Sequence, residues 1–327
     1  MRKESIYEAI QNDIMNAKIS ETDKNKMLKN LMKLKEQKMN IMIVGATGCG
    51  KSSTINAMFD TEVAKVGVGV DPETMEIERY ELDNLILWDT PGLGDGKEAD
   101  NRHAKNIIKK LSEVDENGYA LIDLVLVILD GGTRDLGTSY ELINNIIIPN
   151  LGKGKRERIL VAINQADMAM KGRNWDYEKN EPTQQLVDFL EGKVNSVRNR
   201  VHEATGVIIK PIYYSAGYKE EGVVQSRPYN LSKLLYYIVK ATPSEKRAVY
   251  ANNINKDVEM WKDDDELLDY GEETRSSIFE AIVEGASEGA YIGGAIGSIF
   301  GRLGETIGNG IGTFVGGVIG FIGGLFG

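Results

Sequence analysis

The feature that most constrains the fold is a glycine-rich loop at residues 45–52, which read GATGCGKS. This run fits the phosphate-binding consensus G-x-x-x-x-G-K-[ST]. An apolar run, IMIV at residues 41–44, precedes the loop as an expected buried strand, and residues 53–59 follow with helical spacing. The glycines of such a loop let successive backbone N–H groups turn toward phosphate oxygens. We therefore expect the chain to bind a nucleoside triphosphate.

Later apolar runs predict further buried strands that end in residues suited to nucleotide contacts. These runs are LILW at 85–88, LVLVIL at 124–129, ILVAI at 159–163 and VII at 207–209. The first leads to Asp89, the third to NQAD at 164–167, and the last begins a strand that reaches SAG at 215–217. In open α/β sheets, ligands bind outside the carboxyl ends of the strands. The order of the runs predicts an α/β domain with a doubly wound, mostly parallel sheet and a nucleotide at its carboxyl edge.

In this order the motifs resemble those of the Era/septin-like P-loop GTPase superfamily. Within it, residues from about 40 to 240 look most like a bacterial, often prophage-encoded group described as 50S ribosome-binding GTPases. NQAD is similar to the guanine signature N-K-x-D, SAG is similar to S-A-K, and residues 67–74 resemble a switch I segment. The resemblance implies GTP or GDP with Mg²⁺ as ligands and hydrolysis of GTP to GDP and phosphate as the reaction.

The resemblance also implies three sets of site residues. The catalytic set is Lys51, Thr74 and Gly92. The metal set is Ser52, Thr74 and Asp89. The nucleotide-binding set is Gly45, Thr47, Gly48, Cys49, Gly50, Lys51, Ser52, Ser53, Asn164, Gln165, Asp167, Ser215 and Ala216. In such sites the lysine reaches the β/γ oxygens, the loop serine ligates Mg²⁺, and the carboxylate after the strand holds the metal.

Four positions depart from the family pattern. Gln165 replaces the lysine over the guanine plane, which removes a cation–π contribution, and Gly217 replaces the lysine of the last motif. Gly48 occupies the position of the asparagine in potassium-activated loops, so potassium dependence is not expected by default. Leu93 follows the sequence DTPG where a water-orienting glutamine would stand in Ras-type enzymes, so we expect slow intrinsic hydrolysis.

Composition limits the partners and the compartment. The chain has 39 basic and 49 acidic residues and a net charge of −10, which disfavours DNA as a ligand. One local basic run, residues 153–158, reads as a solvated loop, with a ribosome contact as the alternative. The lone Cys49 fits a reducing compartment, and the basic start is not followed by an apolar signal segment. We expect a cytoplasmic protein, with peripheral or integral attachment to the cytoplasmic face of the inner membrane as an open possibility.

Four segments are expected along the chain. They are an N-terminal helical arm (1–39), a GTPase domain (40–242), a helical connector (243–284) and a glycine-zipper hydrophobic hairpin (285–327). In the arm, Ile6, Ile10 and Ile14 recur at helical spacing, and Ser20 is a candidate cap for a second helix that carries Met27, Leu28, Leu31, Met32 and Leu34 on one face. The arm either packs on the rest of the chain or binds a partner or a second copy.

Three other features are predicted to be unremarkable surface. The insertion at 168–183 is expected to be a long loop, with cover for the base as the alternative. The acidic run at 263–266 is expected to be solvated, and His103 and His202 are expected at surface or helix positions, because neither has metal-ligand spacing.

The glycine-rich tail is the second informative feature. Glycines recur every fourth residue from Gly285 to Gly301 and, after a phase shift, from Gly304 to Gly324. Such a helix is weak alone in water, whereas in lipid small residues at this spacing let two helices pack closely. Residues 306–327 carry no ionisable side chain and are long enough, at about 1.5 Å per residue, to cross a bilayer. The tail predicts membrane association or homo-oligomers, with a hairpin buried against the chain itself as the alternative.

The working function is a GTP-binding, slowly hydrolysing molecular switch that couples nucleotide state to membrane association or self-assembly. Two alternatives remain open. One is a ribosome-associated GTPase, as the family resemblance implies. The other is a membrane-perturbing effector that its GTPase domain controls.

Overall fold

The computed structural model describes residues 6–59, 77–92, 96–134, 136–152, 154, 157–217, 226–292, 295 and 297–301. Its centre is a six-stranded sheet with the order β2-β3-β1-β4-β5-β8. The strands are β1 (Met39–Gly45), β2 (Glu78–Leu82), β3 (Leu85–Asp89), β4 (Leu124–Asp130), β5 (Ile159–Asn164) and β8 (Ile212–Tyr213). Only the β2–β3 pair is antiparallel among these described strands. The prediction of a doubly wound, mostly parallel α/β sheet is confirmed.

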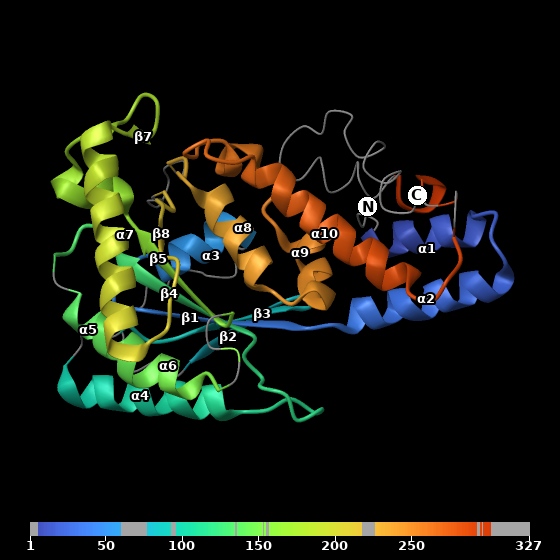
Figure 1. Ribbon diagram of the computed structural model, residues 1–327, viewed down its shortest axis with the longest axis horizontal. Helices are drawn as coiled ribbons and strands as arrows, with labels where there is room; N and C mark the ends of the chain where they lie inside the picture. The colour runs from blue at the N-terminus through green and yellow to red at the C-terminus, as the bar shows by residue number, and fades with distance from the viewer. Residues whose placement is uncertain are drawn as a thin grey trace.

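Helices cover both faces of the sheet (Figure 1). Successive residues of β1 contribute to different faces. Ile41 and Ile43 belong to the core shared with α3 (Lys51–Phe59) and α8 (Leu231–Ala241). Met42 and Val44 belong to the core on the other face. That second core includes residues of α4 (Lys97–Ser112), η1 (Leu142–Ile147), α6 (Ile148–Asn150) and α7 (Gln184–Thr205), with α5 (Gly137–Glu141) leading into η1. Because side chains alternate along a strand, a run that is buried throughout requires this two-sided cover.

The segment η1 is a π-helix, and its cause is local. The Ile148 amide donates to the carbonyl of Ile143, five residues earlier. Pro149 follows directly, has no amide hydrogen, and crowds the carbonyl four residues before it. The wider turn accommodates the proline without ending the helix.

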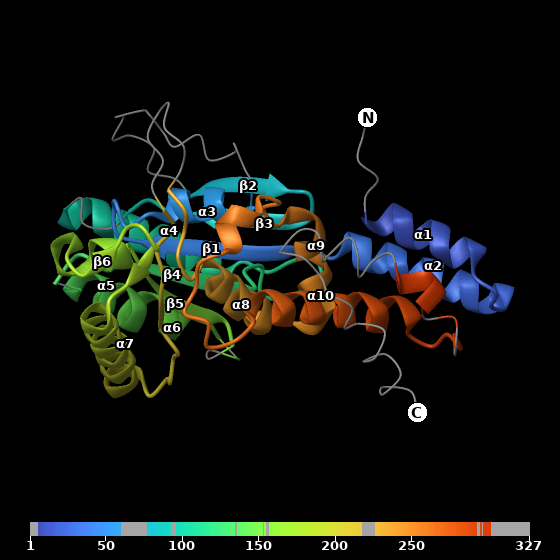
Figure 2. The ribbon, with the colours of Figure 1, turned by 90° about the horizontal axis from the view of Figure 1, so that it is seen from above.

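The N-terminal arm is a helical hairpin of α1 (Ile6–Asn16) and α2 (Glu21–Glu36), which both views place at the far end of the molecule from α5 (Figure 2). Ile6, Ile10 and Ile14 are buried, as their spacing predicts. The cap prediction is confirmed, because the Ser20 side chain accepts a hydrogen bond from the Asp23 amide. Met32 is 64% exposed, so the prediction that it shares the buried face is wrong.

The arm packs on the C-terminal part of the chain. Its buried side chains share one core with α10 (Tyr270–Ser287) and with η3 (Ser244–Val249), α9 (Tyr250–Asn253) and η4 (Val258–Trp261). Gly285 on α10 approaches α2 so closely that a Cβ there would lie 2.8 Å from Leu34 Cδ2. Among the described residues, the hairpin is therefore part of the fold and not a separate arm.

The connector is also joined to the nucleotide domain. Asn255 donates from its side chain to the Ala57 carbonyl, and its amide donates to the Met58 carbonyl, at the end of α3. Lys246 forms a 2.6 Å ion pair with Asp123, whose other oxygen accepts from the Asn40 amide at the start of β1. These contacts fix the connector to the end of α3 and to the start of β1.

The predicted glycine-lined hairpin does not begin as one continuous helix. The boundary expected at 284/285 falls inside α10, which ends at Ser287. Gly289 has a φ of +69°, and the side chains of Lys26 and Asn30 on α2 donate to the carbonyls of Gly289 and Glu288. Residues 302–327, with the second glycine row, lie outside the described residues. Among the described helices, none has the length and apolarity required to cross a bilayer.

Candidate functional site

The site lies along the carboxyl edge of the sheet, where the ends of four strands meet. Strand register aligns Ile43 with Asp89, Gly45 with Ile128, and Asp130 with Asn164. The glycine-rich loop leaves β1 at this edge and enters α3 at Lys51. The predicted phosphate and base motifs are therefore brought to one edge of the molecule.

Two glycines in the loop are required by backbone conformation. Gly48 and Gly50 have φ values of +79° and +89°, a region that L-residues with a side chain seldom adopt. A Cβ at Gly50 would also lie 2.2 Å from the Asn164 side-chain nitrogen. The Lys51 ammonium donates to the carbonyls of Gly45 and Ala46, so it lies folded over the loop.

The loop and the segment after β3 are in close contact. A Cβ at Gly92 would lie 2.1 Å from Thr47 Oγ1 and 2.5 Å from the Thr47 nitrogen. Ser52 and Ser53 lie in the first turn of α3, both half-buried. This brings the predicted phosphate residues Thr47, Gly92 and Ser52 to one side of the edge.

Asp89 has the properties of a cation ligand. Its Oδ1 is buried without a hydrogen-bond partner among the described residues. Burial raises the pKa of this carboxyl to about 6, Lys51 opposes the rise, and Glu78 adds to it. A buried, unsatisfied carboxylate oxygen is costly unless a cation or ordered water satisfies it. Together with the Ser52 hydroxyl, Asp89 therefore fits Mg²⁺, either directly or through water.

Asn164 connects the phosphate loop to the last base motif. Its side-chain nitrogen donates to the Cys49 carbonyl at 2.9 Å, and its side-chain oxygen accepts from the Ala216 amide at 2.9 Å. Gln165 adds a second link, because its side chain donates to the Gly48 carbonyl at 2.8 Å. Ser215 is buried, and its Oγ accepts from the Gly217 amide.

Two further base-site positions have structural explanations. Asp167 lies half-buried in η2 (Ala166–Gly172), directly after the residues that bind the loop. Gly217 has a φ of +71°, and a Cβ there would lie 2.1 Å from the Ser226 carbonyl oxygen. The family lysine cannot be accommodated at residue 217 with this backbone.

Cys49 is an unreactive member of the loop. It is 1% exposed, and burial raises the pKa of its thiol to about 11. The thiolate is the reactive form, so at neutral pH this thiol is a small apolar side chain. Its carbonyl, which accepts from Asn164, is the part that serves the site.

The residues that support the base motif carry no local signal in the sequence. The insertion at 168–183 forms η2 and a small sheet of β6 (Trp175–Asp176) and β7 (Glu181–Pro182). Trp175 is 7% exposed and packs edge-on against Tyr229, whose backbone pairs with Ser215. The prediction of a long surface loop is therefore wrong for Trp175, while Tyr177 is 69% exposed.

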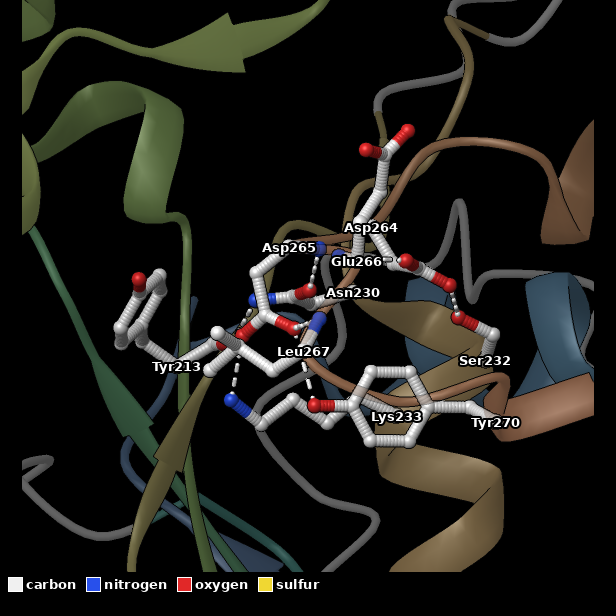
Figure 3. Close-up of polar contacts among 9 residues, drawn as sticks. All are labelled: Tyr213, Asn230, Ser232, Lys233, Asp264, Asp265, Glu266, Leu267 and Tyr270. Atoms are coloured by element: carbon white, nitrogen blue, oxygen red, sulfur yellow. Dashed lines mark hydrogen bonds and ion pairs between the residues drawn. The ribbon is translucent and has the colours of Figure 1, made fainter. Parts of the chain in front are cut away.

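The acidic run is engaged, so the prediction that it is solvated is wrong for its three aspartates. Asp263 pairs with Arg227, and Asp264 accepts from the Ser232 hydroxyl. Asp265 pairs with Lys233 at 2.5 Å and accepts from the Tyr270 hydroxyl at 2.8 Å (Figure 3). These contacts attach the start of α10 to α8.

The same cluster reaches the base motif through Asn230. Its side-chain nitrogen donates to the Tyr213 carbonyl on β8, and its side-chain oxygen accepts from the Asp265 amide (Figure 3). The buried asparagine has a φ of +56°, which this residue type tolerates better than most. The strand before the SAG motif is thus tied to the connector.

His103 is another residue whose position the sequence did not indicate. It lies on α4, is 4% exposed, and its Nδ1 is 3.2 Å from the Gly92 carbonyl oxygen. Thr74, Leu93 and residues 153, 155 and 156 of the basic run lie outside the described residues.

Comparisons with known proteins find similar sequences and structures. Residues 40–165 match the family described as "50S ribosome-binding GTPase". The chain is 26% identical to the uncharacterized protein YfjP of Escherichia coli over 173 residues, which cover 52% of this chain and 55% of YfjP. It is 37% identical to human septin-12 over 86 residues, which cover 21% of this chain and 24% of septin-12.

A solved structure of Toc33 from Arabidopsis thaliana, in complex with GDP and Mg²⁺, is similar with a TM-score of 0.41 and 16% identity. It covers 66% of this chain and 87% of Toc33. The curated alignments span about half of YfjP and a quarter of septin-12. The resemblance to the P-loop GTPase family described as 50S ribosome-binding GTPases is therefore confirmed for residues 40–165, which are 126 of the 327 residues.

Proposed function

We propose that the chain binds GTP and GDP with Mg²⁺ at the carboxyl edge of the sheet and hydrolyses GTP slowly, as a molecular switch. The observation that carries this proposal is the double contact of Asn164, which joins the phosphate loop at Cys49 to the base motif at Ala216. A site that binds phosphates and base together needs its two halves held at a fixed separation. Asn164 supplies that link inside the protein.

Each residue has a role in this proposal. The loop amides and Lys51 bind the α, β and γ phosphates, and Ser52, Asp89 and Thr74 hold the metal. Mg²⁺, when bound, neutralises charge on the β and γ oxygens. Gly92 offers its backbone N–H to the γ-phosphate. Asp167 accepts from the N1 and N2 groups of guanine, while the side chain of Gln165 and the backbone of Ser215–Ala216 border the base.

Phosphate binding is tested by Lys51→Ala. Removal of the ammonium should lower affinity for GTP and GDP by at least tenfold, since charge-assisted contacts to phosphate are strong. Titration calorimetry measures the affinities, and Lys29→Ala on the exposed face of α2 is the matched control. Near-normal GTP binding by the Lys51 variant would contradict the proposal.

Base recognition is tested with three nucleotides and the variant Asp167→Ala. ITP lacks the 2-amino group of GTP, and ATP lacks the donor pattern that Asp167 accepts. We expect affinities in the order GTP, ITP, ATP, because a wrong base leaves a buried carboxylate without its partner. The Asp167 variant should reduce these differences, and equal competition by ATP with wild-type protein would reject the guanine assignment.

The switch is proposed to act on membrane association or self-assembly through the tail. A ribosomal role is the second candidate, which the family description of residues 40–165 favours. Cosedimentation of full-length protein with 50S subunits, compared at low and high salt and with GDP and a GTP analogue, tests that role. Leakage of liposomes that requires the tail but does not require GTP hydrolysis would support a membrane-perturbing effector instead.

A further inference from the structure

The first described segment after β3 is fixed at two points. Thr90 donates from both its amide and its hydroxyl to the Ile43 carbonyl, each at 3.1 Å, which fastens the segment to β1. Two residues later, the Gly92 backbone lies against Thr47 of the phosphate loop. A further contact comes from the buried imidazole of His103 on α4.

The donor in the His103 contact follows from chemistry. The Gly92 carbonyl oxygen can only accept a hydrogen bond, so the Nδ1 atom 3.2 Å away carries the proton and donates. The main chain of Gly92 thus contacts both this donor and the side chain and backbone of Thr47. A glycine alone would be free to rotate, because it lacks the steric restriction of a Cβ.

We propose that His103 is a positioning residue that sets the preference for the nucleoside triphosphate over the diphosphate. The Gly92 N–H and the Gly92 carbonyl lie in two peptide groups that share one Cα. Because Thr90 anchors the chain before this Cα and His103 holds the carbonyl after it, rotation at Gly92 is restricted and its N–H stays where the third phosphate would accept it. This inference rests on the proposed GTP site. The diphosphate has no γ-phosphate and contacts the loop amides and Lys51, so its affinity is independent of Gly92.

A purely structural role for His103 predicts a different pattern. His103, Ile107 and Leu111 form the buried stripe of α4, and an apolar residue of similar size would fill the first position of that stripe equally well. If His103 only fills space, His103→Leu retains function. If it only stabilises the fold, its loss affects GDP and GTP binding equally.

The test compares three variants at residue 103. His103→Asn places an amide nitrogen near the position of Nδ1 and retains the donor. His103→Gln places its amide nitrogen near the position of Nε2 and moves the donor away from Gly92. His103→Leu removes the hydrogen-bond donor. The Asn and Gln variants are both polar and similar in size, so they remain informative if the leucine variant does not fold. His202→Leu is the matched control, since His202 is exposed on α7.

Affinities for GDP and for a non-hydrolysable GTP analogue are measured by titration calorimetry on the full chain with Mg²⁺. We expect the Gln and Leu variants to lose about three- to tenfold in affinity for the analogue, the effect of one net hydrogen bond. GDP affinity should stay within twofold, and the Asn variant should retain the wild-type ratio of the two affinities. Single-turnover hydrolysis should slow in the same two variants and be normal in the His202 control.

Three outcomes would overturn the assignment. The first is an unchanged ratio of analogue affinity to GDP affinity in both the Gln and Leu variants. The second is an equal loss of affinity for both nucleotides. The third is a loss of analogue affinity in the Asn variant as large as in the Gln variant. The failure of the proposed function itself is distinguishable, because wild-type protein would then bind neither guanine nucleotide.

Discussion

Lys233 Nζ lies 2.5 Å from Asp265 Oδ2, and each side chain is only 10% exposed. The pair joins α8, which follows the base motif, to the segment that leads into α10. From there α10 runs for 18 residues, or about 27 Å, and ends against α2. One helix therefore connects the base side of the site to the N-terminal hairpin and to the start of the glycine-rich tail.

The first prediction concerns this buried pair. Asp265→Ala leaves the Lys233 ammonium buried without its partner and removes the acceptor of the Tyr270 hydroxyl. We expect a loss of about 3–5 kcal/mol in the free energy of unfolding, measured by urea titration. The exposed Glu116→Ala should change it by less than about 0.5 kcal/mol.

A double variant checks the explanation. Lys233→Met combined with Asp265→Leu removes both charges, so it should be clearly more stable than Asp265→Ala. A double variant as unstable as the single one would show that the Lys233 charge is not the cause.

This cluster also illustrates what sequence patterns can predict. The loop at 45–52 and the apolar strands were predictable because each signal lies within one short segment. The partners of the acidic run lie far away in sequence: Asp265 is 32 residues from Lys233, and Asp263 is 83 from Asn180. A run of four acidic residues has no local sign of such partners, so it resembled a solvated segment.

The departures from the family pattern were visible in the sequence, but their causes were not. Gly217 was recognisable as a missing lysine, whereas its positive φ and its contact with Ser226 depend on the fold. His103 likewise fits an ordinary helical stripe, and only the path of the chain at Gly92 shows what its Nδ1 contacts.

The second prediction tests the cause at residue 217. Gly217→Lys restores the family residue but forces a side chain into a backbone with φ of +71° and into the Ser226 carbonyl. We expect a loss of about 2 kcal/mol or more in stability, together with no gain in GTP affinity.

The matched control is Gly192→Lys on α7, where a Cβ would meet nothing within 4 Å. That variant should be neutral or slightly stabilising, since lysine has a higher helix propensity than glycine. Tighter GTP binding by the Gly217 variant would contradict this account of the substitution.

The third prediction concerns pH and Asp89. Burial raises its pKa to about 6 in the folded chain, against about 3.9 in an unfolded chain. Between these values the folded chain retains a proton that the unfolded chain has lost. The contribution of Asp89 to stability is therefore fully present below about pH 4 and is lost as the pH rises through about 6.

Asp89→Asn keeps a neutral side chain at every pH. Without nucleotide or metal, it should match wild-type stability near pH 4 and exceed it by about 1–3 kcal/mol at pH 7, as measured by urea unfolding across this range. With Mg²⁺ and GTP the order should reverse, because the variant lacks the charged ligand. A stability difference that does not change between pH 4 and pH 7 would refute the assigned pKa shift.

The last prediction concerns the tail, which is tested by a chain shortened at its C-terminal end. A chain that ends near Tyr270 would lose α10, whose side chains share a core with α1, α2 and α8. A chain that ends at Gly301 retains α10 together with Ile299 and Phe300, both fully buried in that core. Comparison of this shortened chain with the full chain therefore isolates residues 302–327, which contain the second glycine row.

We expect the full chain to float with liposomes and to assemble in a nucleotide-dependent way, and the chain that ends at Gly301 to do neither. Substitution of Gly312, Gly316 and Gly320 by leucine raises hydrophobicity while it blocks close approach of helices. This triple variant should still partition into lipid but should lose assembly, as measured by liposome flotation and light scattering. If the full chain stays monomeric and does not float with liposomes in either nucleotide state, the membrane prediction is wrong. The tail would then pack on its own chain, because a helix so rich in glycine is too weak to persist alone in water.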